Sequence, residues 1–168
     1  MTYLDSIILG VVEGLSEFLP ISSTGHLILV SGLLGLTQTE FLKSFEIVIQ
    51  PGAIAAVLFA YWRSFLDIQI LKRLAVAFIP TAVVGYALYH FIKSYLIGNQ
   101  LIVVVALFLG GIAILIIEYA VKDREKNDGL VTDITYTQSA LIGLAQALAI
   151  IPGVSRSGAT VMGGLLMN

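Results

Sequence analysis

The chain of 168 residues has no cysteine and few charges, which make up 12% of the sequence. Without cysteine it can form no disulfide, no thiolate metal site and no cysteine nucleophile. Soluble domains carry about 25% charged residues, whereas 58% of the residues here are hydrophobic. The net charge is −2, with no basic patch that would indicate nucleic-acid binding. The composition therefore predicts a membrane protein that binds no nucleic acid.

Long apolar runs predict an all-α polytopic protein with a single transmembrane domain over residues 1–168. The start, MTYLDSIILG, lacks the basic region of a cleavable signal peptide. Crossing a bilayer takes about 20 mostly apolar residues, and three segments satisfy this requirement: residues 45–62, 74–92 and 101–121. Pro80 predicts a kink in the second span. Residues 122–135 predict a charged cytoplasmic loop.

Two polar interruptions near the ends of the chain align as an internal repeat. Residues 10–27 read GVVEGLSEFLPISSTGHL, and residues 143–160 read GLAQALAIIPGVSRSGAT. Freed backbone groups are costly in hydrocarbon unless protein or water surrounds them, so we expect re-entrant hairpins over residues 7–36 and 136–168. Three spans separate the hairpins, which would then enter from opposite faces. This predicts an inverted-topology repeat, with the second copy incomplete.

The distribution of basic residues predicts the orientation. Only two fall on the outer side of this topology, Lys43 and Lys93. The others fall on the opposite side: Arg63, Lys72, Arg73, Lys122, Arg124 and Lys126. By the positive-inside rule the second side is cytoplasmic. We therefore expect a multi-pass membrane protein whose first hairpin opens outward, to the periplasmic or extracellular face.

Two carboxylates, Glu13 and Glu17, lie four residues apart and share one face of a helix. Each costs about 2.5–3.5 kcal/mol near a bilayer centre, so a shared proton, Arg156 or a divalent cation must compensate. Hard oxygen ligands suit Mg²⁺ or Ca²⁺ bridging to a phosphate. The alternative is a pair at the membrane surface, wetted by water.

The polar cluster of the first repeat predicts an anion site. It consists of Ser22, Ser23, Thr24, Gly25 and His26. A helix beginning near Thr24 would direct its free N–H groups toward an anion, and His26 would lie close enough to the hydroxyls to act as a base. The alternative is a helix cap beside an interfacial histidine.

The second cluster contains an arginine in an otherwise apolar segment. Its residues are Ser155, Arg156, Ser157, Gly158 and Thr160. Phosphate matches the planar guanidinium best, and the hydroxyls add donors. A structural ion pair between Arg156 and Glu13 or Glu17 is the alternative. Elsewhere, Gly10 and Gly14 are expected to permit close helix packing.

The acidic pair with PISSTGH, together with PGVSRSGAT, resembles the two signature regions of the bacterial undecaprenyl pyrophosphate phosphatase family, also called bacitracin-resistance proteins. The resemblance extends along the whole chain, including FEIVIQPGAIAAV. It implies a protein of the bacterial plasma membrane that hydrolyses an undecaprenyl diphosphate carrier to its monophosphate at the outer face, for reuse in peptidoglycan synthesis. It also implies that Glu13 and Glu17 form the acidic motif, and that Ser23 is the nucleophile activated by His26. The diphosphate-binding segment would contain Ser155, Arg156 and Thr160.

Members of that family are longer than this chain, so we interpret it as an N-terminal portion that is inactive alone unless a homodimer completes the site. The predicted function is hydrolysis of undecaprenyl diphosphate with Mg²⁺ or Ca²⁺ at the acidic pair. Attack by water or by His26 itself stays open. The alternatives are a lipid-diphosphate transporter or flippase, and a non-catalytic module that binds such a lipid.

Overall fold

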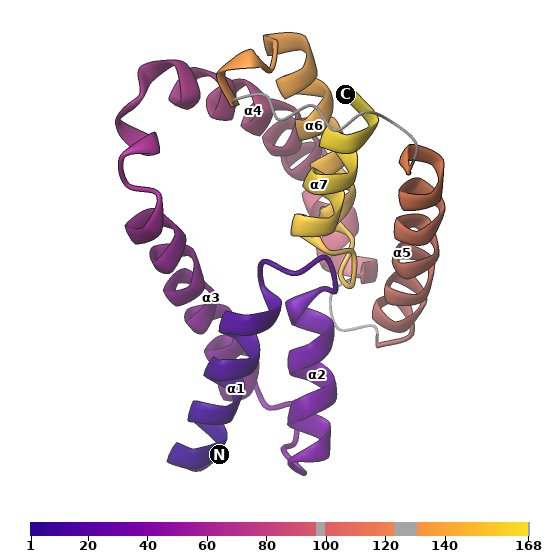
Figure 1. Ribbon diagram of the computed structural model, residues 1–168. Helices are drawn as coiled ribbons and strands as arrows, with labels where there is room; N and C mark the ends of the chain where they lie inside the picture. The colour runs from indigo at the N-terminus through magenta and orange to yellow at the C-terminus, as the bar shows by residue number, and fades with distance from the viewer. Residues whose placement is uncertain (97–99, 123–130, 168) are drawn as a thin grey trace.

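The computed structural model describes residues 1–96, 100–122 and 131–167, and these ranges contain helices and turns but no strand. Figure 1 shows the α-helices, which are α1 (Tyr3–Ser16), α2 (Ser23–Leu33), α3 (Glu40–Ala60), α4 (Ile68–Phe91), α5 (Gln100–Val121), α6 (Tyr136–Ala147) and α7 (Arg156–Met167). Short 3₁₀ turns lie at Ser64–Leu66, Val131–Asp133 and Leu148–Ile150, and a π-helical turn lies at Ile92–Leu96. The prediction of an all-α chain is confirmed for the described residues.

The helices form two groups, with α5 beside both. In the first group α1 packs against α2 and α3, and in the second α6 packs against α4 and α7. Helix α5 contacts α7 and α2. Both interrupted segments form helical hairpins, α1–α2 and α6–α7, and their turns meet in the middle of the molecule after arriving from opposite ends (Figure 1).

In the part of the chain that the structure describes, three helices are long and apolar enough to cross a membrane: Glu40–Ala60, Ile68–Phe91 and Leu101–Val121. They correspond to the three predicted spans, but the first two begin earlier than residues 45 and 74. The side chain of Thr39 caps α3 by accepting from the Leu42 N–H, and that of Asp67 caps α4 by accepting from the Gln69 N–H. Such caps extend a helix into polar sequence that hydrophobicity alone excludes. Helix α4 continues through Pro80.

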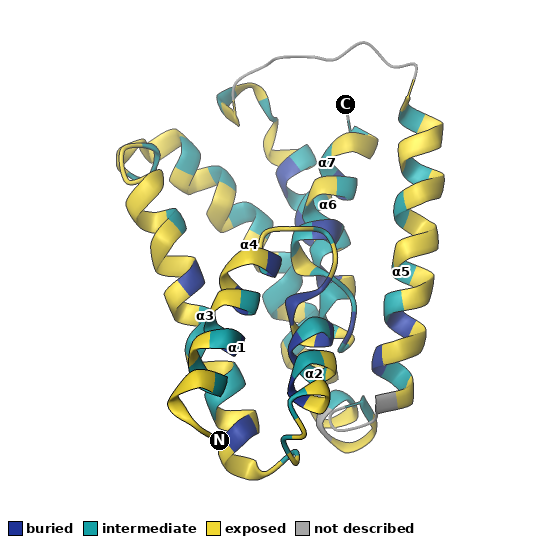
Figure 2. Ribbon diagram, turned by 60° about the horizontal axis from the view of Figure 1, so that its bottom comes forward, coloured by how far each residue is buried: buried dark blue, intermediate teal, exposed yellow. Residues whose placement is uncertain are grey.

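The long helices α3, α4 and α5 are exposed over much of their length (Figure 2), and many of their exposed residues are large and apolar. The fully buried cluster is small and consists of Leu9, Leu27 and Leu42, at the junction of α1, α2 and α3. Contiguous exposed apolar surface of this extent is rare on soluble proteins. The distribution of surface and core is therefore that of an integral membrane protein.

The start of α6 is tied to α4 by one arginine. The Arg73 guanidinium donates to the carbonyls of Thr132 and Ile134, each at 2.6 Å, and lies 5.3 Å from the centre of the Tyr136 ring. Further along, the Thr81 hydroxyl donates to the Gly143 carbonyl at 2.8 Å. These contacts fix where the second hairpin begins.

The turn between α3 and α4, the end of α5 and the beginning of α6 lie at one end of the molecule (Figure 1). This places Arg63, Lys72 and Lys122 on segments that share that end. Two other basic residues of the predicted cytoplasmic side, Arg124 and Lys126, lie outside the described residues, as does most of the predicted 122–135 loop.

Candidate functional site

The two polar turns touch each other directly. The Ser157 hydroxyl donates to the Leu19 carbonyl at 2.7 Å, and the Ser155 hydroxyl lies 3.5 Å from the same oxygen. The two serine hydroxyls are 2.9 Å apart. Hairpins that lie far apart in the sequence are therefore joined at their tips by side-chain hydrogen bonds.

A small polar pocket of about 40 Å³ lies at this junction. Its lining comes from both turns and from α3: Glu17, Ser22, Ser23, Thr24, Gln50, Val154, Ser155 and Arg156. Six of these residues were predicted from the sequence as site residues. Gln50 and Val154 were not. Gln50 follows Glu46 by one turn within an apolar span, and such an isolated polar residue is the signal that could have identified it.

Within this pocket Ser23 is bonded to a carboxylate. Its hydroxyl donates to Oε2 of Glu17 at 2.5 Å. Glu17 caps the end of α1 and Ser23 begins α2, so the intervening turn folds back to bring the two side chains together. Ser23 is buried, and the Glu17 side chain is 13% exposed. A carboxylate that accepts a hydrogen bond from the hydroxyl is placed as a general base requires.

Arg156 approaches the same carboxylate from the second turn. Its Nη1 lies 3.9 Å from Oε1 of Glu17, and the arginine side chain is 58% exposed. An exposed pair at this distance contributes about 0–1 kcal/mol. The guanidinium therefore keeps donors available for an anion, which weakens the alternative of a purely structural ion pair.

Two helix N-termini face the pocket, because α2 begins at Ser23 and α7 at Arg156. Ser22 precedes α2 with φ of 62° and makes no capping hydrogen bond. A non-glycine residue in such a conformation costs about 1–3 kcal/mol and typically lies at a functional site. In α7 the Ser155 hydroxyl accepts from the Gly158 N–H at 3.0 Å. The uncapped N–H groups of α2 and its positive dipole end favour a bound anion.

Glu13 lies one turn before Glu17, with 1% of its surface exposed, and neither carboxylate oxygen has a hydrogen-bond partner. The carboxyl nevertheless lies close enough to the Glu17 carboxyl, the Ser23 hydroxyl and Arg156 to interact with each of them. A buried charge without a partner is costly, so this carboxyl calls for a proton or a cation. No group of three His, Asp or Glu suited to a metal occurs among the described residues.

The pair nevertheless fits a magnesium ion, since Mg²⁺ typically takes one or two carboxylates and completes its shell with water and substrate phosphate oxygens. Glu13 and Glu17 are the residues that would hold it.

No hydrogen bond joins His26 to Ser23 in this geometry. Its Nδ1 lies 2.9 Å from the Ser22 carbonyl oxygen. A carbonyl only accepts, so Nδ1 carries the proton and Nε2 keeps a free lone pair. The Ser23 hydroxyl is instead bonded to Glu17. The structure thus pairs the expected nucleophile with a carboxylate, and His26 is not among the residues that line the pocket.

The other predicted residues lie around the pocket without lining it. Gly25 lies close to the Leu107 side chain, and the Ser157 hydroxyl donates to the Leu19 carbonyl in the first turn. The Thr160 hydroxyl donates back to the carbonyls of α7. Gly158 lines a neighbouring apolar cavity.

Comparisons with known proteins agree on one family. Residues 6–168 match the family described as bacitracin resistance protein BacA. Undecaprenyl-diphosphatase from Sulfurihydrogenibium sp. (strain YO3AOP1) is 52% identical over 168 residues, covering 100% of this chain and 66% of that protein. The enzymes of the same name from Aquifex aeolicus and Wolinella succinogenes are each 51% identical over 169 residues, covering 100% of the chain and 66% and 65% of the relatives. The chain thus spans just under two thirds of the length of these curated relatives.

Proposed function

The chain belongs to the bacitracin resistance protein BacA family, and we propose that it carries the phosphate-hydrolysing site of an undecaprenyl-diphosphatase. The observation that supports this most directly is the 2.5 Å bond between Ser23 and Glu17 in a pocket that also contains Arg156. The proposed nucleophile Ser23, the proposed base Glu17 and the proposed phosphate ligand Arg156 then line the same polar pocket. The substrate is the diphosphate of a long isoprenyl lipid, as the names of the relatives indicate.

The first chemical step is attack by the Ser23 oxygen on the terminal phosphorus. The serine proton passes to Glu17, the new bond forms between Oγ and phosphorus, and the bridging bond breaks. The lipid monophosphate leaves with the electron pair of that bond. Arg156 and the N–H groups at the start of α2 stabilise the charge that develops on the phosphoryl oxygens.

The second step releases inorganic phosphate from the phosphoserine. Water attacks the phosphorus, Glu17 returns its proton to the Ser23 oxygen, and the bond between Oγ and phosphorus breaks. His26, held by the Ser22 carbonyl with Nε2 free, is a second candidate base, either for this water or for Ser23 after a change of side-chain conformation. Contacts of this kind often tighten only when substrate is bound.

A divalent cation, Mg²⁺ or Ca²⁺, fits beside these groups. Glu13 and Glu17 would hold it, and when bound it would supply positive charge that neutralises the diphosphate. The two unpartnered oxygens of Glu13 support this assignment. Without the ion, the same carboxyl would need a proton to remain buried.

The proposed topology places α1–α2 and α6–α7 as re-entrant hairpins of an inverted repeat, with α3, α4 and α5 crossing a bacterial plasma membrane. The meeting of the two turns and the opposite approach of the hairpins support it (Figure 1). The basic residues near the α3–α4 turn and the end of α5 favour a cytoplasmic location for that side. The pocket would then open outward, where a carrier lipid for cell-wall synthesis is recycled.

Because the chain alone is expected to be inactive, the test joins it to the part of the Aquifex aeolicus relative that lies beyond the matched residues and measures phosphate release from undecaprenyl diphosphate in proteoliposomes. This joined protein is the wild type in every activity measurement below. We expect the wild type to release one phosphate per lipid and Ser23→Ala to release almost none, with both folded by circular dichroism. Movement of the lipid across the bilayer without phosphate release would indicate a flippase instead. Binding of the lipid diphosphate with neither phosphate release nor movement across the bilayer would indicate a non-catalytic binding module.

A further inference from the structure

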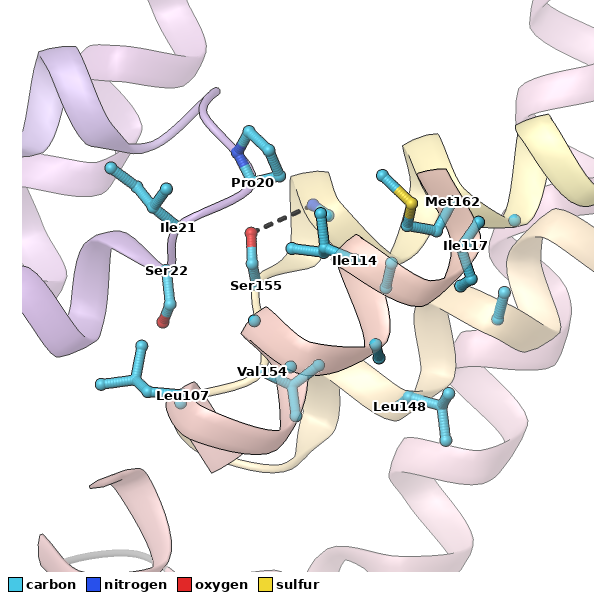
Figure 3. Close-up of a pocket in the computed structure, with 18 of the residues that line it drawn as sticks. Pro20, Ile21, Ser22, Leu107, Ile114, Ile117, Leu148, Val154, Ser155 and Met162 are labelled. Carbon is cyan, nitrogen blue, oxygen red and sulfur yellow. Dashed lines mark hydrogen bonds between the residues drawn. The ribbon is translucent and has the colours of Figure 1, made fainter. Parts of the chain in front are cut away.

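The two helical hairpins correspond in structure at the same offset as in sequence. Helices α1 and α6 begin 133 residues apart, and so do α2 and α7. Their first turns agree in detail, since Thr2 and Thr135 each form a capping box. In the connecting turns Ser22 and Ser155, again 133 residues apart, line one apolar cavity together (Figure 3). The hairpins are therefore two copies of one structural unit.

In the second copy, one face of the first helix is covered. Helix α4 crosses α6 at Gly143, where a Cβ would clash with the Ala77 carbonyl oxygen and where the carbonyl of the glycine accepts from the Thr81 hydroxyl at 2.8 Å. Four residues to either side along α6, Ser139 and Ala147 are buried as well. A stripe of small residues on α6 thus lies against two small residues of α4.

In the first copy, the matching stripe on α1 is uncovered. It consists of Ser6, Gly10 and Gly14, and none of these residues is buried. A Cβ added at either glycine would meet nothing within 4 Å. Helix α1 packs instead through a different face, around Leu9, against α2 and α3. The same stripe therefore occurs twice in the described residues, once with a helix across it and once without.

We propose that the stripe on α1 is the docking site for a membrane-spanning helix from the third of the relatives that this chain does not cover, and that this helix crosses α1 at Gly10. Its chemistry follows from α4: an apolar helix with two small residues four positions apart, in the places of Ala77 and Thr81, the second with a hydroxyl. Small residues let helix backbones approach closely, and this drives helix association in membranes.

The remaining third of the relatives has a suitable length. The 168 residues of this chain are 66% of the Sulfurihydrogenibium relative, which leaves about 85 residues. That is about the length of the stretch from α3 to α5, Glu40–Val121. A repeat that continues through it contains a counterpart of α4. The two hairpins arrive from opposite ends (Figure 1), so a twofold rotation that exchanges them carries α6 onto α1 and α4 onto this counterpart.

The first experiment uses the joined protein with a protease site at the junction. The chain has no cysteine, so Ser6→Cys gives a single reporter in the stripe once any cysteine of the added part is replaced by serine. A second cysteine is then moved along each long helix of the added part. Disulfides need Cα atoms about 4.4–6.8 Å apart. After oxidation and cleavage, we expect the two fragments to stay linked only for positions on one face of the second added helix.

Ser64→Cys provides the control, because Ser64 lies in the turn between α3 and α4, at the opposite end of the molecule from the start of α1 (Figure 1). It should link to none of the positions that Ser6→Cys selects. Disulfides from Ser6→Cys to a second copy of the protein would assign the stripe to self-association and overturn the proposal. So would the absence of any link to an added helix.

The second experiment tests the close approach at Gly10 by comparing Gly10→Leu with Gly32→Leu. Gly32 also has no neighbour within 4 Å, and its counterpart in the second copy is Leu165, so a leucine is tolerated at that place in the unit. We expect Gly10→Leu to lower the thermal midpoint of the joined protein by about 4 °C or more. It should not lower that of the 168-residue chain alone. Gly32→Leu should change neither.

An unchanged midpoint of the joined protein with Gly10→Leu would overturn the crossing at Gly10, and an equal fall in the chain alone would place the clash within the residues described here. Both experiments measure structure rather than phosphate release. A joined protein that shows the expected disulfides but no activity would therefore count against the proposed function alone, and an active protein without them against the docking site alone.

Discussion

The Ser23 hydroxyl and Oε2 of Glu17 are 2.5 Å apart, and this bond joins the beginning of α2 to the end of α1. From the sequence we expected the base that activates Ser23 to be His26, which lies three residues further along the same helix. The structure places the His26 ring on the Ser22 carbonyl instead. The two arrangements predict different results when the residues are replaced in pairs.

Ser23→Ala and Glu17→Gln should each lower kcat by on the order of 10²–10⁴-fold, the usual range for loss of a base or its partner. The double variant should be no more than about threefold worse than the poorer single variant, because groups that act as one unit lose their effect together. Phosphate release under saturating substrate measures this.

The same double-replacement experiment with Ser23→Ala and His26→Ala provides the control. If His26 were the base for Ser23, the losses in kcat from Ser23→Ala and His26→Ala would be non-additive. The losses from Ser23→Ala and Glu17→Gln would then multiply in the double variant. Such a pattern would contradict the assignment of Glu17 as the base.

Arg156→Lys should lower kcat/KM about 10–100-fold, because the point charge of lysine cannot replace two parallel hydrogen bonds to phosphate. Its thermal midpoint should match the wild type, since the exposed 3.9 Å contact with Glu17 contributes little to stability. Activity within about threefold of the wild type would mean that Arg156 serves only as a counter-charge to the carboxylates.

Glu13→Gln should remove stabilisation by Mg²⁺ or Ca²⁺. Saturating metal at about 100 times its Kd raises stability by about 2.7 kcal/mol in a protein that has the site. We expect a metal-dependent rise in the thermal midpoint of the wild type and of Glu40→Gln, whose side chain is exposed, but not of Glu13→Gln. Without metal, Glu13→Gln should be about as stable as the wild type, because a buried carboxyl that holds a proton and the amide that replaces it are both neutral groups of similar size. An equal rise in Glu13→Gln would place the metal elsewhere.

Gly143→Ala should destabilise the fold, since a Cβ there would lie against the carbonyl oxygen of Ala77 in α4. Separating two packed helices in this way costs about 1–3 kcal/mol or more. Gly10→Ala, at the matching position of the repeat, meets nothing within 4 Å and should be neutral or slightly stabilising. Thermal unfolding in detergent compares the two, and equal effects would contradict the close α4–α6 crossing.

Hydrophobicity was sufficient to predict the three long apolar helices and the two interrupted helical hairpins, because both depend on the length of apolar runs and on the breaks between them. The exact starts of α3 and α4 were missed, since the caps at Thr39 and Asp67 are single hydrogen bonds that a hydropathy window averages away. The expectation of close packing at Gly10 and Gly14 was wrong within the described structure. Neither glycine has a neighbour there, and Gly143 has one instead.

From the sequence we could predict which residues gather at the candidate site, but not which of them are hydrogen-bonded to each other. Ser22, Ser23, Arg156 and Glu17 line one pocket, as the aligned polar clusters indicated. The hydrogen-bond acceptor of the Ser23 hydroxyl depends on how the turn over residues 17–22 folds back. Ser22 in this turn has a positive φ, which cannot be predicted from its being a serine. The apolar cavity depends on α5 lying beside α7, a long-range contact that no local pattern encodes.

The bond from Ser157 to Leu19 also has a consequence for biosynthesis. Its partners are separated by 138 residues, and ribosomes add about 5–20 residues per second, so the first hairpin waits roughly 7–30 seconds for the second. Throughout that interval Glu13 has neither the second turn nor Arg156 nearby, and a charged carboxylate is costly in hydrocarbon. In the proposed topology the nascent α1–α2 segment would therefore stay at the wet membrane surface or in a hydrated insertase until α6 and α7 emerge. The second hairpin would then decide when the first one enters the bilayer.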